Sequence, residues 1–186
     1  MKFTLTTKEK QGVFPQTEKY LLELGLQIVS RDVNRPWGGF FVIDEKQAPL
    51  FGKLFFPNED LSHLSGSKLS PKILMVQPGM QLSWQYHHRR SEIWKVISGK
   101  AGVITSDTDK EGSLVQLNTG DIVRLAQGQR HRLVGLDGWG IIAEIWQHTD
   151  ATHPSDEEDI VRAWIYYYRP SLLHFSSQCY YYNFFH

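Results

Sequence analysis

The sequence predicts an all-β fold, an antiparallel sandwich or barrel with short flanking helices. From Trp37 onward the chain breaks into short segments rich in Val, Ile, Trp and Phe, which is the composition of strands. Turn-like pieces separate these segments, and no long helical segment lies between them, which disfavours a parallel sheet with crossover helices. The predicted strands read FFVID, KILMVQ, LSWQYH, EIWKVIS, AGVITS, SLVQLN, DIVRL, HRLVG and GIIAEIWQ.

The connections between the predicted strands have the composition of tight turns, because Gly, Pro, Asn and Asp each favour a turn for a conformational reason. Turns at this close spacing predict hairpins and meanders. The turn-like pieces are PGM at 78–80, SGKAG at 98–102, DTDKEGS at 107–113, NTGD at 118–121 and DGWG at 137–140.

Two short helices are expected outside the strands. The stretch TEKYLLELGLQ, from Thr17 to Gln27, places leucines at helical intervals after a threonine that can cap the helix. Near the other end, Ser155 and Glu158 have the spacing of a capping box. This spacing predicts a short helix through DEEDIVRAW.

The chain is expected to form one domain, because 186 residues suit a single core. Residues 1–34 are assigned to a lead-in, 35–150 to the barrel, and 151–186 to a C-terminal helix and an aromatic tail that packs on the barrel. Within the barrel, residues 48–71 are harder to assign, since LFGKLFFP could form a strand whereas NEDLSHLSGSKLSP resembles a long polar loop. We expect an insertion here that can act as a lid over the site.

Composition excludes several classes of partner. Apolar residues make up 41% of the sequence and charged residues 22%, as in folded globular proteins. Twenty basic residues balance twenty acidic residues, so no overall positive field would attract nucleic acid or an anionic membrane. The chain has no long apolar run and no signal-like amino terminus, which favours the cytoplasm, and its one cysteine, Cys179, is expected to be a buried free thiol.

The stretch QYHHRRSE concentrates side chains that bind metal ions. Alternation along the strand LSWQYH places Gln85 and His87 on one face of that strand. Glu92 begins the next strand after a short turn, so it can fold back beside them. His131, at the start of a distant strand, is the best candidate for a fourth ligand. These four residues predict one metal site inside the barrel.

The spacing of these residues resembles the first sequence motif of the cupins. That motif has a glycine, then HxH, a glutamate and a second glycine. Gly79, His87, Glu92 and Gly99 occupy their places in it, while Gln85 stands where the first histidine would be. The resemblance implies a double-stranded β-helix, the cupin jelly-roll barrel.

The second cupin motif is also present in part. Gly120, Gly128 and His131 fit it, whereas Ala126 replaces its proline and Gly135 replaces its asparagine. Both departures fall at positions that we assign to turn and packing. They bear on loop geometry and leave the predicted ligands intact.

A Gln, His, Glu and His quartet is similar to the zinc site of phosphomannose isomerases, and the flanking sequence resembles the cupin-type mannose-6-phosphate isomerase domain. The matching pieces are RPWGGFFVID, QYHHRRSEIWKVISG, HRL, AEIWQ and EEDIVR. The resemblance implies a metal-dependent aldose-ketose isomerase that acts on a sugar phosphate, uses zinc and forms a homodimer. In such a reaction a divalent cation can polarise the sugar oxygens as a proton leaves the carbon beside the carbonyl.

Further residues are expected to serve this reaction. Glu144, a charged residue in the apolar strand IIAEIWQ, is predicted to be an interior base or a partner of a ligand histidine, although it could equally pair with an arginine. Arg132 is a second catalytic candidate, although the parity of HRL would point it away from His131. The cations that could bind a phosphate are Arg89, Arg90, Lys53, Lys72 and Arg162.

Other interpretations fit the same residues. The quartet could be polar side chains that satisfy one another without metal, or the protein could be a cupin that binds a sugar or a small acid without turning it over. A His and carboxylate site also suits iron and oxygen chemistry, although Gln85 argues against it. Surface exposure is favoured over catalysis for His88, and a packing corner is favoured over a substrate contact for RPWG.

Overall fold

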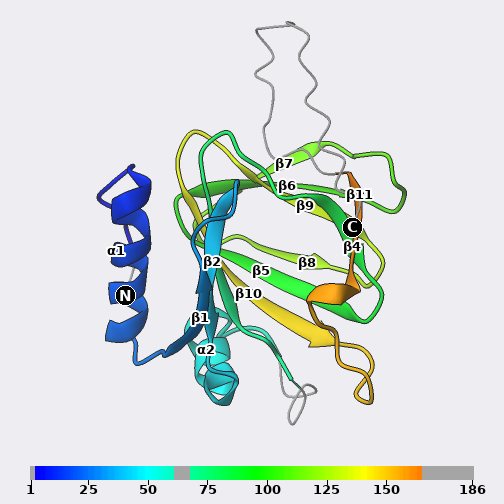
Figure 1. Ribbon diagram of the computed structural model, residues 1–186, viewed down its shortest axis with the longest axis horizontal. Helices are drawn as coiled ribbons and strands as arrows, with labels where there is room; N and C mark the ends of the chain where they lie inside the picture. The colour runs from blue at the N-terminus through cyan, green and yellow to red at the C-terminus, as the bar shows by residue number, and fades with distance from the viewer. Residues whose placement is uncertain (1–2, 61–67, 165–186) are drawn as a thin grey trace, which may run out of the picture.

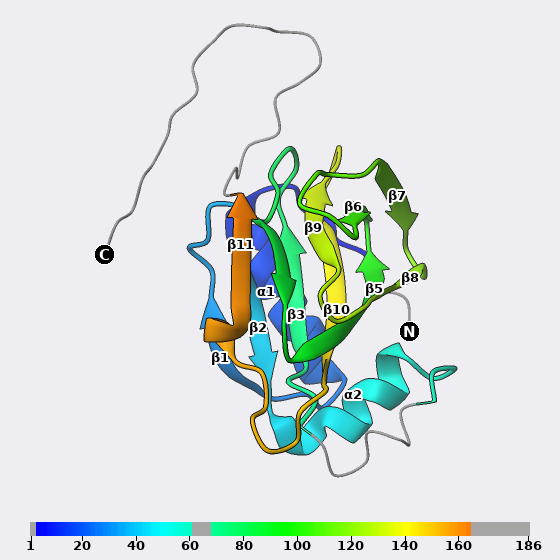
Figure 2. The ribbon, with the colours of Figure 1, turned by 90° about the vertical axis from the view of Figure 1, so that its right-hand side faces the viewer.

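The computed structural model describes residues 3–60 and 68–164, which form two antiparallel sheets that face each other (Figures 1 and 2). The elements are α1 Lys10–Glu23, β1 Ile28–Asp32, β2 Gly38–Ile43, η1 Glu45–Gln47, α2 Ala48–Phe55, β3 Lys72–Val76, β4 Trp84–His87, β5 Arg90–Ser98, β6 Lys100–Ser106, β7 Leu114–Asn118, β8 Ile122–Leu125, β9 Arg130–Gly135, β10 Gly140–His148, η3 Glu157–Asp159 and β11 Ile160–Trp164. The six-stranded sheet has the order β1-β2-β3-β10-β5-β8, and the five-stranded sheet has the order β11-β4-β9-β6-β7.

The predicted all-β jelly-roll fold is confirmed, and all nine predicted strands are present as β2 to β10. Two further strands extend the sheets outside residues 35–150, because β1 pairs with β2 and β11 pairs with β4. The leading helix α1 starts earlier than predicted. The hydroxyl of Thr17 donates to the carbonyl of Val13 (2.9 Å) inside this helix and does not cap it.

The six-stranded sheet is buried on both faces, which explains the long apolar runs in β3 and β10. Along β10, Ile141 and Ile145 face the core formed with α1 and α2, whereas Ile142 faces the core between the two sheets. This alternation follows from the two-residue period of a strand. The outer core includes Phe14 of α1, whose ring packs edge-on against Phe41 and Trp139, with both pairs of centroids 5.9 Å apart.

The prediction of a strand for LFGKLFFP is wrong, because this stretch forms most of α2. Ala48, Phe51 and Phe55 recur at helical intervals and are buried in the outer core, on the far side of the six-stranded sheet from the space between the sheets. The helix therefore does not act as a lid over that space. Residues 61–67, which also belong to the predicted lid insertion, lie outside the described residues.

The prediction of a helix through DEEDIVRAW is wrong for most of its length. Only the short 3-10 turn η3 forms, with the carboxylate of Asp156 accepting from the backbone N–H groups of Glu158 (3.0 Å) and Asp159 (3.1 Å). The chain then continues as β11, because the edge of β4 offers unpaired backbone groups.

The predicted aromatic tail and Cys179 lie outside the described residues. Within those residues, no helix has the length and hydropathy needed to cross a bilayer.

Candidate metal centre

Three strands bring His87, Glu92 and His131 together in the space between the sheets. These side chains are buried, and one potential ligand atom from each lies within 4.8 Å of the others. The turn before β9 is fixed against the end of β4, because the N–H of Gly128, at a φ of 78°, donates to the carbonyl of His87 (2.9 Å). Gln85 of β4 pairs in register with His131 of β9. The alternation predicted from the sequence therefore points these side chains inward.

Both histidines direct Nε2 toward the carboxylate of Glu92. Nε2 of His87 lies 3.2 Å from Oε1 of Glu92, and Nε2 of His131 lies 3.5 Å from Oε2. The other ring nitrogen of each histidine faces a backbone carbonyl, that of Asp159 for His87 (3.4 Å) and that of Gln129 for His131 (2.9 Å). Donation from Nδ1 to these carbonyls fixes the tautomer that leaves Nε2 free to bind a metal.

The electrostatics of the cluster also suit a cation. Burial lowers the pKa of His87, although the charge of Glu92 acts in the opposite direction. Burial alone would raise the pKa of Glu92, but His87 and His131 hold it well below its ordinary value. Neutral imidazoles and an ionised carboxylate are the forms that bind a metal. Among the described residues, Nε2 of His131 is buried and has no hydrogen-bond partner, so a divalent cation would satisfy it.

The guanidinium of Arg90 lies against the same ligand atoms. Its Nε donates to Oε1 of Glu92 (2.8 Å), and its Nη2 lies 3.1 Å from Nε2 of His87. Its Nη1 donates to the hydroxyl of Ser155 (2.7 Å), and its carbon Cζ lies 3.5 Å from the ring centroid of Trp146. A bound metal and Arg90 would therefore share, or compete for, two of the three ligand side chains.

The turn between β4 and β5 is held by Asp159 from the far end of the described chain. The carboxylate of Asp159 accepts from the backbone N–H groups of His88 (3.1 Å) and Arg89 (3.0 Å), and from the hydroxyl of Ser155 (2.6 Å). The segment around η3 thus fixes both the turn between two ligand strands and the Ser155 hydroxyl that Arg90 contacts.

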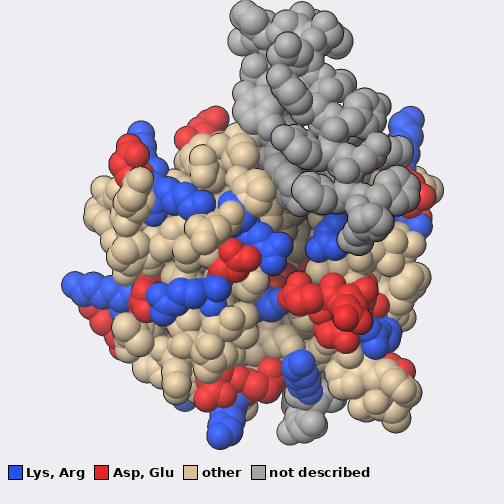
Figure 3. All heavy atoms as spheres, viewed as in Figure 1, with Lys and Arg blue, Asp and Glu red and all other residues tan. Residues whose placement is uncertain are grey.

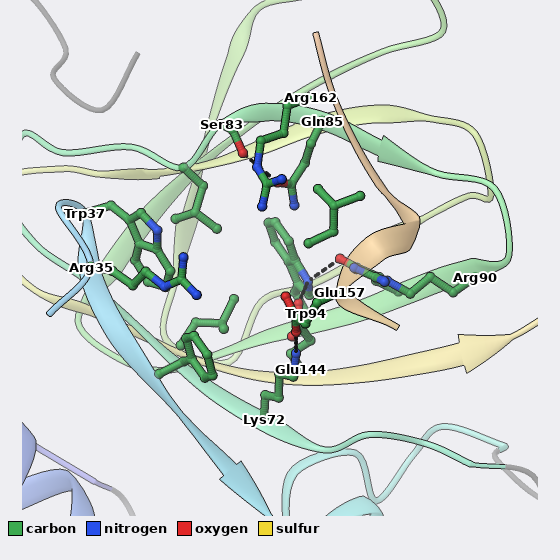
Figure 4. Close-up of a pocket in the computed structure, with 15 residues that line it drawn as sticks. Arg35, Trp37, Lys72, Ser83, Gln85, Arg90, Trp94, Glu144, Glu157 and Arg162 are labelled. Carbon is green, nitrogen blue, oxygen red and sulfur yellow. Dashed lines mark hydrogen bonds and ion pairs between the residues drawn. The ribbon is translucent and has the colours of Figure 1, made fainter. Parts of the chain in front are cut away.

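A pocket opens beside the cluster and is lined by residues of both sheets (Figure 4). Trp94 connects its two inner carboxyl groups, because the indole Nε1 donates to Oε2 of Glu92 (3.1 Å) and to Oε1 of Glu144 (2.9 Å). Burial, and next the charge of Glu92, raise the pKa of Glu144 to about 8. Glu144 therefore lies in the pocket with a raised pKa, and its role as an interior base stays a prediction.

The predicted fourth ligand, Gln85, lines this pocket, and its Oε1 accepts from the hydroxyl of Ser83 (2.7 Å). Its place as a metal ligand stays a prediction.

Arg132 does not lie in the pocket, because the alternation of β9 turns it to the opposite face from His131. There it pairs with Glu111 (3.0 Å), so the structure does not bring Arg132 together with the other predicted site residues. His88 is exposed, as expected.

The predicted phosphate-binding cations divide into two groups. Lys72, Arg90 and Arg162 line the pocket. Arg89 does not, because it pairs with Asp156 (3.1 Å) and Asp159 (3.5 Å) beside the turn, and Lys53 is exposed on α2 behind the six-stranded sheet. Figure 3 shows acidic side chains gathered over η3 with basic side chains near them, so this face carries charges of both signs.

The pocket also contains residues that the sequence analysis did not assign to the site, among them Trp94 and Glu157, and it contains Arg35 and Trp37 of RPWG, for which a packing corner was favoured over a substrate contact. Trp37 is buried and also packs in the core between the sheets, so the prediction of a packing corner describes one of its two contacts. The signal was present in RPWG, a motif already noted as part of the family resemblance.

Comparison with known proteins identifies the family of the chain. A family model described as Mannose-6-phosphate isomerase C-terminal matches residues 53–163. The chain belongs to this family. Among curated relatives, mannose-1-phosphate guanylyltransferase 2 of Escherichia coli O157:H7 is 36% identical over 83 residues, which cover 45% of this chain and 13% of the relative. The xanthan biosynthesis protein XanB of Xanthomonas campestris pv. campestris (strain B100) is 34% identical over 103 residues, covering 55% of this chain and 17% of XanB.

This member of the mannose-6-phosphate isomerase C-terminal family therefore spans less than a fifth of the length of those relatives. Its fold is also similar to solved structures of oxalate decarboxylase. The Bacillus subtilis enzyme at pH 4.6 matches with a TM-score of 0.51 and 15% identity, over 72% of this chain and 29% of that chain. The formate complex of the Lactobacillus farciminis enzyme matches with a TM-score of 0.50 and 16% identity, over 72% and 33%. At this identity the likeness shows the fold alone.

Proposed function

We propose that the protein is a metal-dependent isomerase that interconverts an aldose phosphate and a ketose phosphate, with mannose 6-phosphate as the aldose. The observation that carries the proposal is the buried cluster of His87, Glu92 and His131 beside a pocket that contains Glu144. These three side chains, with Gln85 as the predicted fourth, would hold the ion, for which we propose zinc. When bound, the ion supplies positive charge that stabilises the negative charge developing on the sugar oxygens.

The reaction moves one proton from C2 of the aldose to C1 and one hydroxyl proton from O2 to O1, so it needs no oxidant or reductant. Glu144 is the residue that would carry the carbon-bound proton. The indole of Trp94 fixes one oxygen of this carboxyl group (2.9 Å). In the protein without metal, a pKa of about 8 keeps both the acid and the base form of Glu144 accessible near neutral pH, which a group that removes and returns a proton requires.

The test is turnover of mannose 6-phosphate by purified, zinc-loaded protein, followed as the formation of fructose 6-phosphate. Glu144→Gln keeps an acceptor for the Trp94 indole and is expected to lower kcat at least about a hundredfold, as loss of a general base does. Lys53→Gln changes an exposed charge outside the pocket and should leave kcat unchanged. Absence of turnover by protein that holds a full equivalent of zinc would reject the proposal.

The position of Arg90 favours one alternative, a cupin that binds a sugar or small acid without metal or turnover. Its guanidinium makes hydrogen-bonding contacts with Glu92 and His87 that a metal would otherwise take. Calorimetric binding of mannose 6-phosphate to zinc-free protein, together with no measurable affinity for divalent cations, would select this alternative.

A further inference from the structure

The charged groups of the pocket are not equally available to a ligand. Of its four basic side chains, Lys72 and Arg90 are already neutralised by carboxylates. Nζ of Lys72 lies 2.6 Å from Oε1 of Glu157, and Nε of Arg90 lies 2.8 Å from Oε1 of Glu92. A phosphate that approached either cation would have to break a short ion pair with a neighbouring carboxylate. Of the two remaining cations, the side chain of Arg162 has no carboxylate partner among the described residues. Arg35 pairs with Asp32, but both side chains of that ion pair are partly exposed, so it is weaker than a buried pair.

Arg162 lies on β11 directly across from Gln85 of β4. Residues paired across antiparallel strands project from the same face, so Arg162 extends into the pocket beside Gln85, as Figure 4 shows. Its side chain is exposed at the mouth of the pocket. Within residues 3–60 and 68–164 it makes no ion pair and no hydrogen bond. No described residue occupies the donors of this guanidinium.

Arg35 reaches the pocket from the turn between β1 and β2 (Figure 4). The turn is fixed by the N–H of Gly38, which donates to the carbonyl of Arg35 (3.1 Å). Nε of Arg35 pairs with Oδ2 of Asp32 (2.8 Å), and this partly exposed ion pair orients the guanidinium. The side chain is 43% exposed, so its charge can be reached from solvent.

We propose that Arg35 and Arg162 form a phosphate subsite at the mouth of the pocket, and that Trp37 flanks the sugar that the phosphate carries. This inference rests on the proposed function for the identity of the sugar. The planar fork of a guanidinium matches two phosphate oxygens at once, and two such groups facing one pocket suit a dianionic phosphate monoester. A ligand held here by its phosphate extends inward toward Glu144 and the metal-ligand cluster.

The experiment measures the affinity of the full chain for mannose 6-phosphate, mannose and inorganic phosphate by calorimetry. Arg35→Gln and Arg162→Gln should each weaken mannose 6-phosphate binding by about tenfold or more, the usual effect of losing a charge-assisted hydrogen bond, and should leave mannose binding unchanged. Arg162→Lys should restore only part of the affinity, because an ammonium lacks the planar fork. Lys53→Gln is the control that removes an exposed charge outside the pocket.

Equal affinity of the variants and the natural protein for mannose 6-phosphate would overturn the inference. So would an equal loss of affinity for mannose 6-phosphate and mannose, because that result indicates a general change of the pocket. A natural protein that binds neither inorganic phosphate nor mannose 6-phosphate would also overturn it. If Arg35→Gln does not fold, Arg162→Gln decides alone, since the side chain of Arg162 has no ion pair or hydrogen bond with the described residues.

Failure of the phosphate subsite and failure of the proposed isomerase activity give different results. Protein that binds mannose 6-phosphate through these arginines but forms no fructose 6-phosphate would retain the phosphate subsite and reject the isomerase. Turnover of mannose 6-phosphate with unchanged KM in both arginine variants would retain the isomerase and reject the phosphate subsite.

Discussion

Replacing Arg90 by methionine tests the electrostatic balance of the cluster. In the protein without metal, Arg90 is the cation that compensates the carboxylate of Glu92, and both side chains are almost fully buried, with 1% and 2% exposed. Met fills similar space and keeps an apolar contact with Trp146, but it leaves Glu92 without that hydrogen bond. We therefore expect Arg90→Met to destabilise the metal-free protein strongly.

The expected magnitude follows from the burial of the pair. Removing one partner of a buried ion pair lowers the free energy of unfolding by about 3–5 kcal/mol, because the other charge stays buried. In a chain of this size each kcal/mol corresponds to about 2–4 °C in Tm, so a loss of roughly 6–20 °C is expected. Arg89→Gln removes a neighbouring arginine whose side chain is 33% exposed, and it should lower the free energy of unfolding by no more than about 1 kcal/mol.

Zinc should reverse most of this loss. A cation held by His87, Glu92 and His131 replaces the charge that Arg90 supplied, and a ligand at about a thousandfold its Kd stabilises the folded state by about 4 kcal/mol. In the variant, zinc no longer competes with the guanidinium for Nε2 of His87, so the Kd of zinc should fall. The gain in the free energy of unfolding on adding zinc should then exceed that of the natural protein.

The assay is urea unfolding of both variants and the natural protein, with a chelator and with saturating zinc. The reasoning is refuted if Arg90→Met and Arg89→Gln lose equal stability without metal. It is also refuted if zinc leaves the difference between Arg90→Met and the natural protein unchanged, because Arg90 would then support the fold independently of the cluster.

Three further outcomes are expected. Glu144 has a folded pKa of about 8 and an ordinary value of 4.5, so its stabilising contribution is complete below the lower value and is lost as the pH rises through the higher one. Glu144→Gln should therefore reduce the fall in metal-free stability between about pH 5 and about pH 9, and parallel curves from urea unfolding would contradict the raised pKa. His131→Ala should abolish stoichiometric zinc binding in elemental analysis, while His88→Ala, on the exposed face, should retain it. Phe14→Ala should lower the free energy of unfolding by about 3 kcal/mol in chemical denaturation, and a change below about 1 kcal/mol would contradict the packing of α1 on the sheet.

The strands could be predicted because their signal is local. Short Val- and Ile-rich segments between turn residues identify β2 to β10, and the parity of LSWQYH and HRL places the ligand histidines correctly on the inner face. The segment LFGKLFFP carries no such signal, since a short apolar run is compatible with a strand or a helix. Its helical form depends on packing against the outer face of a sheet that the local sequence does not reveal.

The elements that were missed depend on contacts between distant parts of the chain. A capping-box spacing at Ser155 suggested a helix, but the following residues pair with β4, which precedes them by more than seventy positions. Arg90 was expected to bind phosphate, and its position against the ligand atoms depends on Ser155, 65 residues away. Pairing of this kind is a tertiary effect that overrides local propensity.

The carboxylate of Asp159 couples opening of the segment before β11 to exposure of the turn between β4 and β5. It accepts from the amides of His88 and Arg89, so those two amides are protected from solvent only while the segment preceding β11 stays docked. Local opening of that segment would expose both amides in one cooperative event, and it would release the Ser155 contact of Arg90 at the same time. Hydrogen exchange at these two positions should therefore occur at a common rate, shared with the amides of β11. This rate reports how often the segment around Asp159 separates from the turn between β4 and β5.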